Sequence, residues 1–378
     1  MFCEYQNDCG GCLFRNLPEE QYRAQKLQTF KKIMSSLSQK NVAFGEAVFI
    51  GDNKRRRAEF SFEIKGKTLL FGYNKRQTHD IADITKCLLL CENINSILPD
   101  IRDFLQEFCY ISVLKKEKGG KKRNISVKKG QIFITSCANG IDICVEVAEN
   151  LELEHRLLIA DFVNTHAEII SFSYKNQKGM FETIVQKVAP FINIADYQIK
   201  VPSASFMQAS DQSEKALIAL VQKYMADTTG NIADLFCGMG TFSYPLSKNI
   251  KNKITAVDSS AELLDVFQKN INANEIPNIK ILKRNLFKYP LEDIELKGFS
   301  AIVFDPPRAG ASAQVKAISS LKNEEKPQKI IAVSCNPHTF VNDANVLLES
   351  GYYIEEITMV DQFNYSNHTE LVALLVKK

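Results

Sequence analysis

One cysteine has the surroundings expected of a nucleophile, in the sequence Ser334-Cys335-Asn336-Pro337. The apolar run 330–333 before it predicts a buried strand. Pro337 suits the first turn of a helix, where the N–H that it lacks would be unpaired anyway. Unpaired backbone amides and the helix dipole favour a thiolate at such a junction, so we expect a pKa below the ~8.5 of a free cysteine. The alternative for a lone cysteine is a small apolar side chain in the core.

A second group of cysteines lies near the N-terminus. Cys3, Cys9 and Cys12 form a C-x5-C-x2-C pattern, with two glycines between the last two. Three thiolates leave one ligand position open, which Cys87 or Cys91 could fill. Ligation by four thiolates fits a [4Fe-4S] cluster or a structural zinc ion. Zinc ribbons usually have two C-x2-C pairs, but the residues alone do not decide between the two metals.

A glycine loop follows the predicted strand 231–236, in the sequence Cys237-Gly238-Met239-Gly240-Thr241. Glycines at the carboxyl end of a first strand let the backbone approach a ligand closely. The loop lacks the third glycine of a dinucleotide site and the lysine of a P-loop. The next strand ends in Asp258, which could accept hydrogen bonds from both hydroxyls of a ribose. This combination favours S-adenosylmethionine as the ligand.

Further polar residues follow later strands of the same region. Asn285 comes after strand 279–282 and could contact an adenine edge, and Asp305-Pro306-Pro307-Arg308 comes after strand 300–304. Rigid prolines beside an acid could hold a planar base against a methyl donor, although an ordinary proline turn is the alternative. The stretch from Asp361 to Glu370 adds an Asp, a His and a Glu to the same carboxyl edge.

The elements that must position these residues follow from hydrophobic periodicity. From residue 211 onward strands and helices alternate, which predicts a doubly wound parallel sheet of the Rossmann-like α/β class. Residues 41–200 are rich in alternating strands and predict an α+β domain, and 201–378 a second domain, after an N-terminal segment 1–40. Helices are predicted at 18–37, 92–108, 151–163 and 211–225, and strands at 58–64, 68–73, 131–137, 141–147, 167–174, 231–236, 253–257, 279–282, 300–304, 330–333, 352–359 and 371–376.

Composition limits the class of protein. The chain has 378 residues, of which 45% are hydrophobic and 24% charged, so it can bury a large core. No apolar run of ~18 residues predicts a membrane span, and the N-terminus lacks the pattern of a signal peptide, so we expect a cytoplasmic protein. The net charge of +3 does not by itself indicate nucleic acid. Two basic clusters, 54–57 and 115–123, could grip phosphates or be solvated surface.

Taken together, these motifs resemble the RNA uridine carbon-5 methyltransferases, which make 5-methyluridine in tRNA or ribosomal RNA. The matching pieces occur in family order and are Phe206-Met207-Gln208, Asp234-Leu235-Phe236-Cys237-Gly238-Met239-Gly240, Asp305-Pro306-Pro307-Arg308, Ser334-Cys335-Asn336-Pro337 and Asp361-Gln362-Phe363 through His368-Thr369-Glu370. The resemblance implies a class I methyltransferase domain preceded by an α+β RNA-binding region that carries a cluster held by four cysteines.

The resemblance also implies roles for single residues. Cys335 would add to carbon 6 of the uracil, and Glu370 would remove the proton from carbon 5. Residues that bind S-adenosylmethionine or border the target base would be Gln208, Phe236, Thr241, Asp258, Asn285 and Asp305. The [4Fe-4S] ligands would be Cys3, Cys9, Cys12 and Cys87. The target uridine would have to leave its stack to reach Cys335.

Two branches of the family compete for the substrate. The cysteine cluster resembles the ribosomal RNA branch, whereas Gln362 resembles the tRNA branch. We expect 23S ribosomal RNA, with the tRNA T-loop as the alternative, and a monomer. Two alternative functions differ in kind from these. One is a methyltransferase that acts on another base, and the other is an iron-sulfur RNA-binding protein with an inactive catalytic domain.

Overall fold

The computed structural model describes residues 2–116, 122–176 and 178–378. The chain forms two compact units. The first unit contains the chain up to residue 16 together with 51–192 and 200–211, and the second contains 17–50, 193–199 and 212–378. The predicted division into 1–40, 41–200 and 201–378 stays a prediction of domains.

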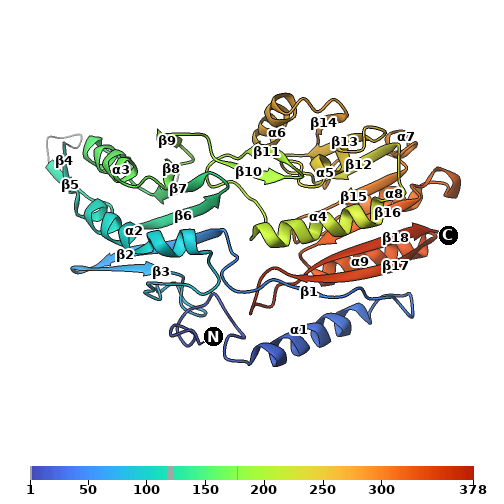
Figure 1. Cartoon of the computed structure of the whole chain (residues 1–378), viewed down its shortest axis with the longest axis horizontal. Coiled ribbons are helices and arrows are strands. Elements are labelled where there is room, and N and C mark those ends of the chain that lie inside the picture. The colour runs from blue at the N-terminus through green and yellow to red at the C-terminus, as the bar shows by residue number, and fades with distance from the viewer. Residues whose placement is uncertain (1, 117–121, 177) are drawn as a thin grey trace. The chain divides into compact units, whose positions relative to one another are not determined.

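The second unit is built on an eight-stranded sheet in the order β1-β17-β18-β16-β15-β12-β13-β14 (Figure 1). Its strands are β1 (Val48–Phe49), β12 (Asn231–Leu235), β13 (Lys253–Asp258), β14 (Ile279–Lys283), β15 (Ala301–Phe304), β16 (Lys329–Ser334), β17 (Tyr352–Asp361) and β18 (Glu370–Lys377). All pairs are parallel except those that β18 makes with β16 and β17. The order reverses at β12, as in a doubly wound fold, which confirms the predicted Rossmann-like class.

Helices connect and cover these strands. They are α1 (Glu19–Met34), α4 (Asp211–Met225), α5 (Ser243–Ser247), α6 (Ala261–Ala273), α7 (Asp293–Leu296), α8 (Ser312–Ser320) and α9 (Pro337–Glu349), with a 3₁₀ turn at Asn323–Glu325. Apolar residues of α1, α8 and α9 share one core with the sheet. β15 is apolar throughout, and β16 is apolar from Ile330 to Val333, because both faces of these strands are covered.

The first unit contains a six-stranded sheet in the order β3-β2-β6-β7-β8-β9, in which only β7 and β8 pair in parallel. Its strands are β2 (Arg57–Lys65), β3 (Thr68–Gly72), β6 (Lys129–Cys137), β7 (Gly140–Val147), β8 (Ile169–Asn176) and β9 (Phe181–Gln186). Helices α2 (Glu92–Tyr110) and α3 (Leu153–Thr165) bury apolar side chains in the core of this sheet. This is the α+β arrangement predicted for this part of the chain.

Two short hairpins complete the described elements. β4 (Val113–Lys116) and β5 (Lys122–Ile125) pair antiparallel within the predicted basic cluster 115–123, of which residues 117–121 lie outside the described residues. β10 (Phe191–Ile194) and β11 (Tyr197–Lys200) form the other hairpin. This hairpin was not predicted, because its turn residues Ala195 and Asp196 adopt positive φ, and the glycine that usually indicates such a turn is absent from both positions.

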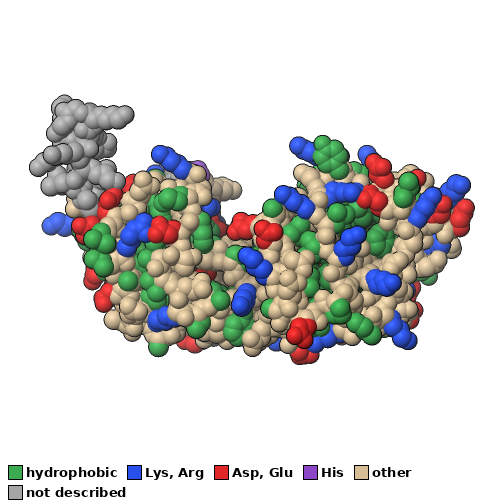
Figure 2. Space-filling view, turned by 90° about the horizontal axis from the view of Figure 1, so that it is seen from above, with side chains coloured by type: hydrophobic (Ala, Val, Ile, Leu, Met, Phe, Trp, Pro, Cys, Tyr) green, Lys and Arg blue, Asp and Glu red, His purple; other side chains and the backbone are tan. Residues whose placement is uncertain are grey.

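The face drawn in Figure 2 carries charges of both signs. On the face drawn in Figure 2, Lys and Arg side chains are interspersed with Asp and Glu, as the small net charge suggests. Within the described residues, no helix has the length and apolar character needed to cross a membrane.

Candidate active site and cysteine pocket

Three reactive side chains gather at the carboxyl edge of the sheet in the second unit. Asp305 follows β15, Cys335 follows β16, and Glu370 is the first residue of β18. Because β18 runs antiparallel to β16, its first residue lies at the edge where β16 ends. Ser334 pairs with Leu371, so the next positions, Cys335 and Glu370, stand opposite each other. One antiparallel strand thus brings the carboxyl group of Glu370 close to the Cys335 thiol.

The junction at Cys335 has the predicted form. β16 ends at Ser334 and α9 begins at Pro337, with Asn336 as its N-cap. The Oδ1 of Asn336 accepts a hydrogen bond from the N–H of His338 at 3.1 Å, and its Nδ2 donates to the carbonyl of Arg308 at 3.0 Å. The cysteine loop is therefore tied to the turn that carries Asp305.

The electrostatic prediction for Cys335 is wrong. Burial, followed by the charges of Glu370 and Asp305, raises the pKa of the thiol to about 11. Its own backbone N–H and Arg308 lower the pKa, but by less. The thiol is therefore protonated at neutral pH in this state. Neutralising the adjacent carboxylates would lower its pKa.

Glu370 has the properties of a base that works near neutral pH. It is 2% exposed, and burial raises its pKa to about 7, against a smaller lowering by Gln362. The Nε2 of Gln362 donates to Oε2 of Glu370 at 2.6 Å. Burial and the charge of Glu370 also raise the pKa of Asp305. The two carboxyl groups therefore resist being ionised together.

The glycine loop after β12 has the close approaches that its sequence predicts. Gly240 has φ +92°, and a Cβ there would lie 2.3 Å from the Phe267 ring, so only glycine fits. The N–H of Gly238 donates to Oδ2 of Asp258 at 3.0 Å. Phe236 has φ +61°, which is rare for an aromatic residue. The loop and the end of β13 are thus held in one arrangement.

Asn285 and Gln208 lie in different surroundings. Asn285 lines an open cavity with Ser259, Lys283 and Tyr289, and its Oδ1 accepts from the N–H of Phe287 at 3.1 Å. Gln208 is buried and belongs to the first unit.

The basic run 54–57 is not the four-cation phosphate grip that the sequence suggested. Arg56 is 6% exposed and its Nε donates to the carbonyl of Gln208 at 3.2 Å. Arg57 donates to the carbonyl of Met207 at 3.1 Å and lies over the Phe206 ring. Burial lowers the pKa of Arg57. These two arginines hold the 206–208 segment within the first unit, and Lys54 is exposed.

The buried stripe of α1 contains a lysine, Lys26, whose burial was not predicted. Tyr22, Lys26, Phe30 and Met34 are the buried residues of this helix, at a spacing of four. A lysine within an apolar stripe was the available signal, because such a charge is rarely buried without partners. Its partners are Asp361 and the carbonyls of the loop that precedes Glu370.

The four predicted cluster ligands line one small pocket in the first unit. Cys3, Cys9, Cys12 and Cys87 are among its lining residues, whereas Cys91 is the N-cap residue of α2. Gly10 lies against the chain at Asn74, whose carbonyl oxygen would be 2.8 Å from a Cβ. Arg76 also secures the N-terminal segment, because it donates to the carbonyl of Cys12 at 2.7 Å.

The pocket has one unusual polar group. The buried hydroxyl of Tyr73 has no hydrogen-bond partner among the described residues, and Tyr73 lines the pocket with the four cysteines. Burial raises the pKa of Cys12 to about 12, and Cys87 adds to this. Across the described part of the chain, no three His, Cys, Asp or Glu side chains are grouped so that they could hold a metal ion.

Comparison with known proteins gives a consistent result. A sequence model of the family described as tRNA (Uracil-5-)-methyltransferase matches residues 19–378. An uncharacterized RNA methyltransferase of Brucella suis is 30% identical over 99% of this chain and 84% of its own length. The 23S rRNA (uracil(1939)-C(5))-methyltransferase RlmD of Mannheimia succiniciproducens is 27% identical over 100% of this chain and 81% of its own length.

The fold also has a solved counterpart. The Pyrococcus abyssi tRNA (uracil-54, C5)-methyltransferase, in complex with S-adenosyl-L-homocysteine, superposes with a TM-score of 0.73 at 22% identity. The match covers 97% of this chain and 86% of that protein. At this identity the likeness establishes the fold.

Proposed function

Because the chain belongs to the tRNA (uracil-5-)-methyltransferase family, we propose that it methylates carbon 5 of a uridine in RNA through a covalent adduct on Cys335. It is an RNA methyltransferase of the uracil-5 class that uses S-adenosylmethionine. The observation that carries the adduct proposal is the placement of Cys335 opposite Glu370, with Asp305 beside them, at one edge of the sheet.

Each side chain has a defined part in the proposed reaction. The Cys335 thiol, protonated in the free protein, passes its proton to solvent as its sulfur adds to carbon 6 of the uracil, and this makes carbon 5 nucleophilic. S-adenosylmethionine supplies an electrophilic methyl group, and carbon 5 bonds to it as the sulfur–methyl bond breaks. Glu370 then takes the proton from carbon 5, the bond between carbon 6 and sulfur breaks, and the thiolate is restored. A pKa of about 7 suits Glu370 to this step.

We assign the methyl donor to the glycine loop and its neighbours. Phe236, Thr241, Asp258 and Asn285 follow strands β12, β13 and β14 on the carboxyl edge, where ligands bind in doubly wound sheets. Asp258 accepts the N–H of Gly238 through Oδ2 and the N–H of Ser260 through Oδ1, and each carboxylate oxygen keeps a further lone pair for a ribose hydroxyl. Gln208 keeps the role that the resemblance implies, to bind the donor or border the target base, and its carbonyl accepts from Arg56.

We propose 23S ribosomal RNA as the substrate. The relatives named for 23S rRNA align with the whole of this chain, and the cysteine pattern at positions 3, 9, 12 and 87 was the feature that suggested this branch. The competing substrate is tRNA, which the solved counterpart modifies according to its name. The basic hairpin β4–β5 and Lys54 are proposed RNA contacts of a cytoplasmic, monomeric enzyme.

The test uses unmodified 23S rRNA and tRNA transcripts in separate reactions with S-adenosylmethionine and anaerobically purified protein. After digestion, mass spectrometry measures 5-methyluridine. Product from rRNA alone supports the proposal, and product from tRNA alone replaces rRNA with tRNA. Cys335→Ala should abolish product, and Glu370→Gln should trap protein on RNA in a band that survives denaturing electrophoresis. Full activity in Cys335→Ala would eliminate the adduct.

We further propose that Cys3, Cys9, Cys12 and Cys87 hold a [4Fe-4S] cluster of structural role. All four cysteines line one pocket, and four thiolates are the ligands that such a cluster takes. The Tyr73 hydroxyl, which has no hydrogen-bond partner among the described residues, can donate to a sulfur in this pocket. The cluster has no part in the methyl transfer steps.

The two candidate fourth ligands give a matched test of the cluster. Anaerobic protein should contain about four irons and four sulfides per chain, and absorb near the wavelengths of an iron-sulfur centre. Cys87→Ser should lose the iron, whereas Cys91→Ser should keep it. Iron retained in Cys87→Ser, or zinc found in place of iron and sulfide, would contradict the proposal.

A further inference from the structure

The loop between β17 and β18, residues 362–369, leads directly into the proposed base, Glu370. Gln362 is its first residue and hydrogen-bonds to Glu370, which immediately follows its last. The loop contains only local turns, such as the N–H of Ser366 donating to the carbonyl of Phe363 at 3.1 Å. The loop itself has no strand partner, whereas Glu370 pairs with Val360 of β17 at the start of β18. Contacts that hold the loop therefore act on Glu370 through Gln362 and through the chain that leads into the strand.

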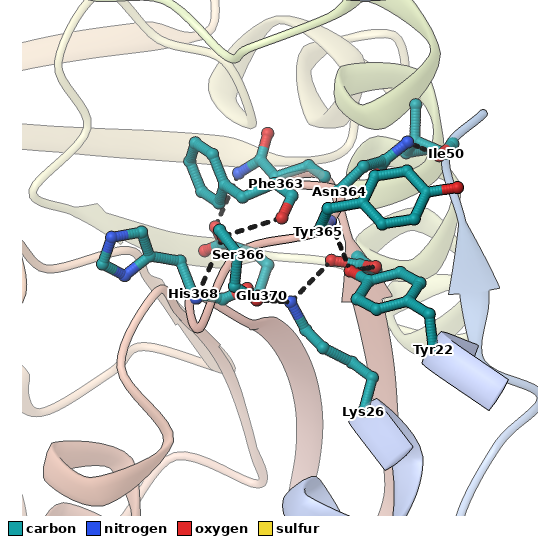
Figure 3. Close-up of polar contacts among 11 residues, drawn as sticks. Tyr22, Lys26, Ile50, Phe363, Asn364, Tyr365, Ser366, His368 and Glu370 are labelled. Atoms are coloured by element: carbon teal, nitrogen blue, oxygen red, sulfur yellow. Dashed lines mark hydrogen bonds and ion pairs between the residues drawn. The ribbon is translucent and has the colours of Figure 1, made fainter. Parts of the chain in front are cut away.

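Lys26 of α1 supplies three of those contacts (Figure 3). Its Nζ donates to the carbonyls of Ser366 at 2.7 Å and His368 at 2.6 Å, and it forms an ion pair with Oδ1 of Asp361 at 2.9 Å. Two of the three N–H donors of the ammonium group are used in these hydrogen bonds, and its charge lies beside the Asp361 carboxylate. The side chain is only 5% exposed, and that of Asp361 is 1% exposed. Such a buried charge pair is retained only where the geometry satisfies both partners.

Tyr22 adds a second anchor one turn earlier on α1. Its hydroxyl donates to Oδ2 of Asp361 at 2.5 Å and accepts from the N–H of Tyr365 at 2.8 Å. The rings of Tyr22 and Tyr365 stack, with centroids 4.5 Å apart. Asn364 donates to the carbonyl of Ile50, in the same N-terminal part of the second unit. Figure 3 shows both α1 side chains pointing toward the loop that ends at Glu370.

These contacts could serve stability alone, as buried ion pairs elsewhere do. The groups engaged argue for more than that. Three are backbone groups of the loop, namely the carbonyls of Ser366 and His368 and the N–H of Tyr365, and the fourth is the Asp361 carboxylate directly before the loop. We infer that α1 braces this loop, and that Tyr22 and Lys26 are positioning residues for Glu370. The inference rests on the proposed role of Glu370 as the base that releases the product.

A displaced base has a specific kinetic signature in this mechanism. Addition of Cys335 and methyl transfer precede proton removal from carbon 5, so a defect confined to Glu370 makes the methylated adduct accumulate. A reactive group displaced by about 1 Å can lose on the order of 100-fold in rate. A general loss of folding would instead lower adduct, product and methyl-donor binding together.

The experiment compares Tyr22→Phe and Lys26→Met with matched controls in the same unit. Tyr224→Phe removes a buried hydroxyl that bonds to Glu356 and Thr358, and Lys326→Met removes a buried ammonium that bonds to the carbonyl of Ser350. Neither control touches loop 362–369 through these bonds. Each variant is assayed for 5-methyluridine, for covalent RNA adduct on a denaturing gel, for the KM of RNA and for S-adenosylhomocysteine affinity.

We expect kcat to fall about 10- to 100-fold in Lys26→Met and several-fold in Tyr22→Phe, with adduct accumulating as in Glu370→Gln and with KM and affinity nearly unchanged. Both controls should behave as the unsubstituted protein. The inference is overturned if Tyr22→Phe and Lys26→Met turn over like the controls, or if they lose activity without adduct. If the unsubstituted protein makes no 5-methyluridine from either RNA, it is the proposed function that fails.

Discussion

The raised pKa of Glu370 predicts that replacing this residue stabilises the protein at alkaline pH. Burial raises its pKa from 4.5 to about 7, so the folded protein binds a proton that the unfolded chain releases. Stability is therefore lost as pH rises from about 4.5 to about 7, and the full cost persists above that. At about 1.4 kcal/mol per pKa unit, the cost is about 1.4 kcal/mol at pH ~5.5 and about 3 kcal/mol at pH ~8.5. Glu370→Gln removes the charge while keeping the shape and an oxygen for Gln362 to donate to.

The assay is urea unfolding of both proteins at pH ~5.5 and pH ~8.5. We expect the stability advantage of Glu370→Gln to grow by about 2 kcal/mol between the two conditions. Glu355→Gln, at an exposed position on β17, is the control for removing one negative charge. An advantage that does not grow with pH, or that grows equally in the control, would refute the burial of an ionisable Glu370.

Three further outcomes follow from the same geometry. Glu370→Gln should lower the pKa of Cys335 from about 11 by roughly one unit, measured as the pH dependence of iodoacetamide labelling in the tryptic peptide after Lys329, where Cys335 is the only cysteine; an unchanged profile would contradict this. Gly240→Ala should cost several kcal/mol in unfolding because of the Phe267 ring, whereas Gly238→Ala, with open space around it, should cost about 1–2 kcal/mol for its positive φ; equal costs would be inconsistent with the clash. Arg56→Met should lower the free energy of unfolding by about 1–3 kcal/mol, because the buried carbonyl of Gln208 loses this donor, whereas the exposed Lys54→Met should have little effect, as urea unfolding would measure.

The sequence was sufficient where local pattern decides the structure. The apolar run before Cys335 and the proline after it predicted the strand and helix that meet there. Alternating strands and helices predicted the doubly wound sheet, because the period of each element is a local property. β1 was missed because two residues, Val48 and Phe49, carry no periodicity, and they pair only with a strand far along the chain.

The electrostatics of the site could not be read in the same way. The pKa of Cys335 depends on burial and on Glu370 and Asp305, which the sheet brings together from separate segments. The helix dipole is a local effect on the pKa of Cys335, and it is outweighed by burial and by the two neighbouring carboxylates, which the local sequence does not reveal.

The burial of Arg56 could have been predicted from the alternation of β2. Ala58, Phe60 and Phe62 form the buried face of β2. Extending their period of two backward places Arg56 on the same face, where the structure has it buried. Which carbonyl it would bind was beyond the sequence, because its partner Gln208 is 152 positions away.

The brace between α1 and loop 362–369 has a consequence for synthesis of the chain. Tyr22 and Asp361 are separated by 339 positions, and Lys26 and Ser366 by 340. Translation proceeds at roughly 5–20 residues per second, so α1 leaves the ribosome some 20 seconds or more before its buried partners exist. Until then the lysine and tyrosine must remain solvated on an incomplete helix face, and the proposed base cannot be fixed in place. A protein assembled this way completes the buried contacts of α1 among its last folding events.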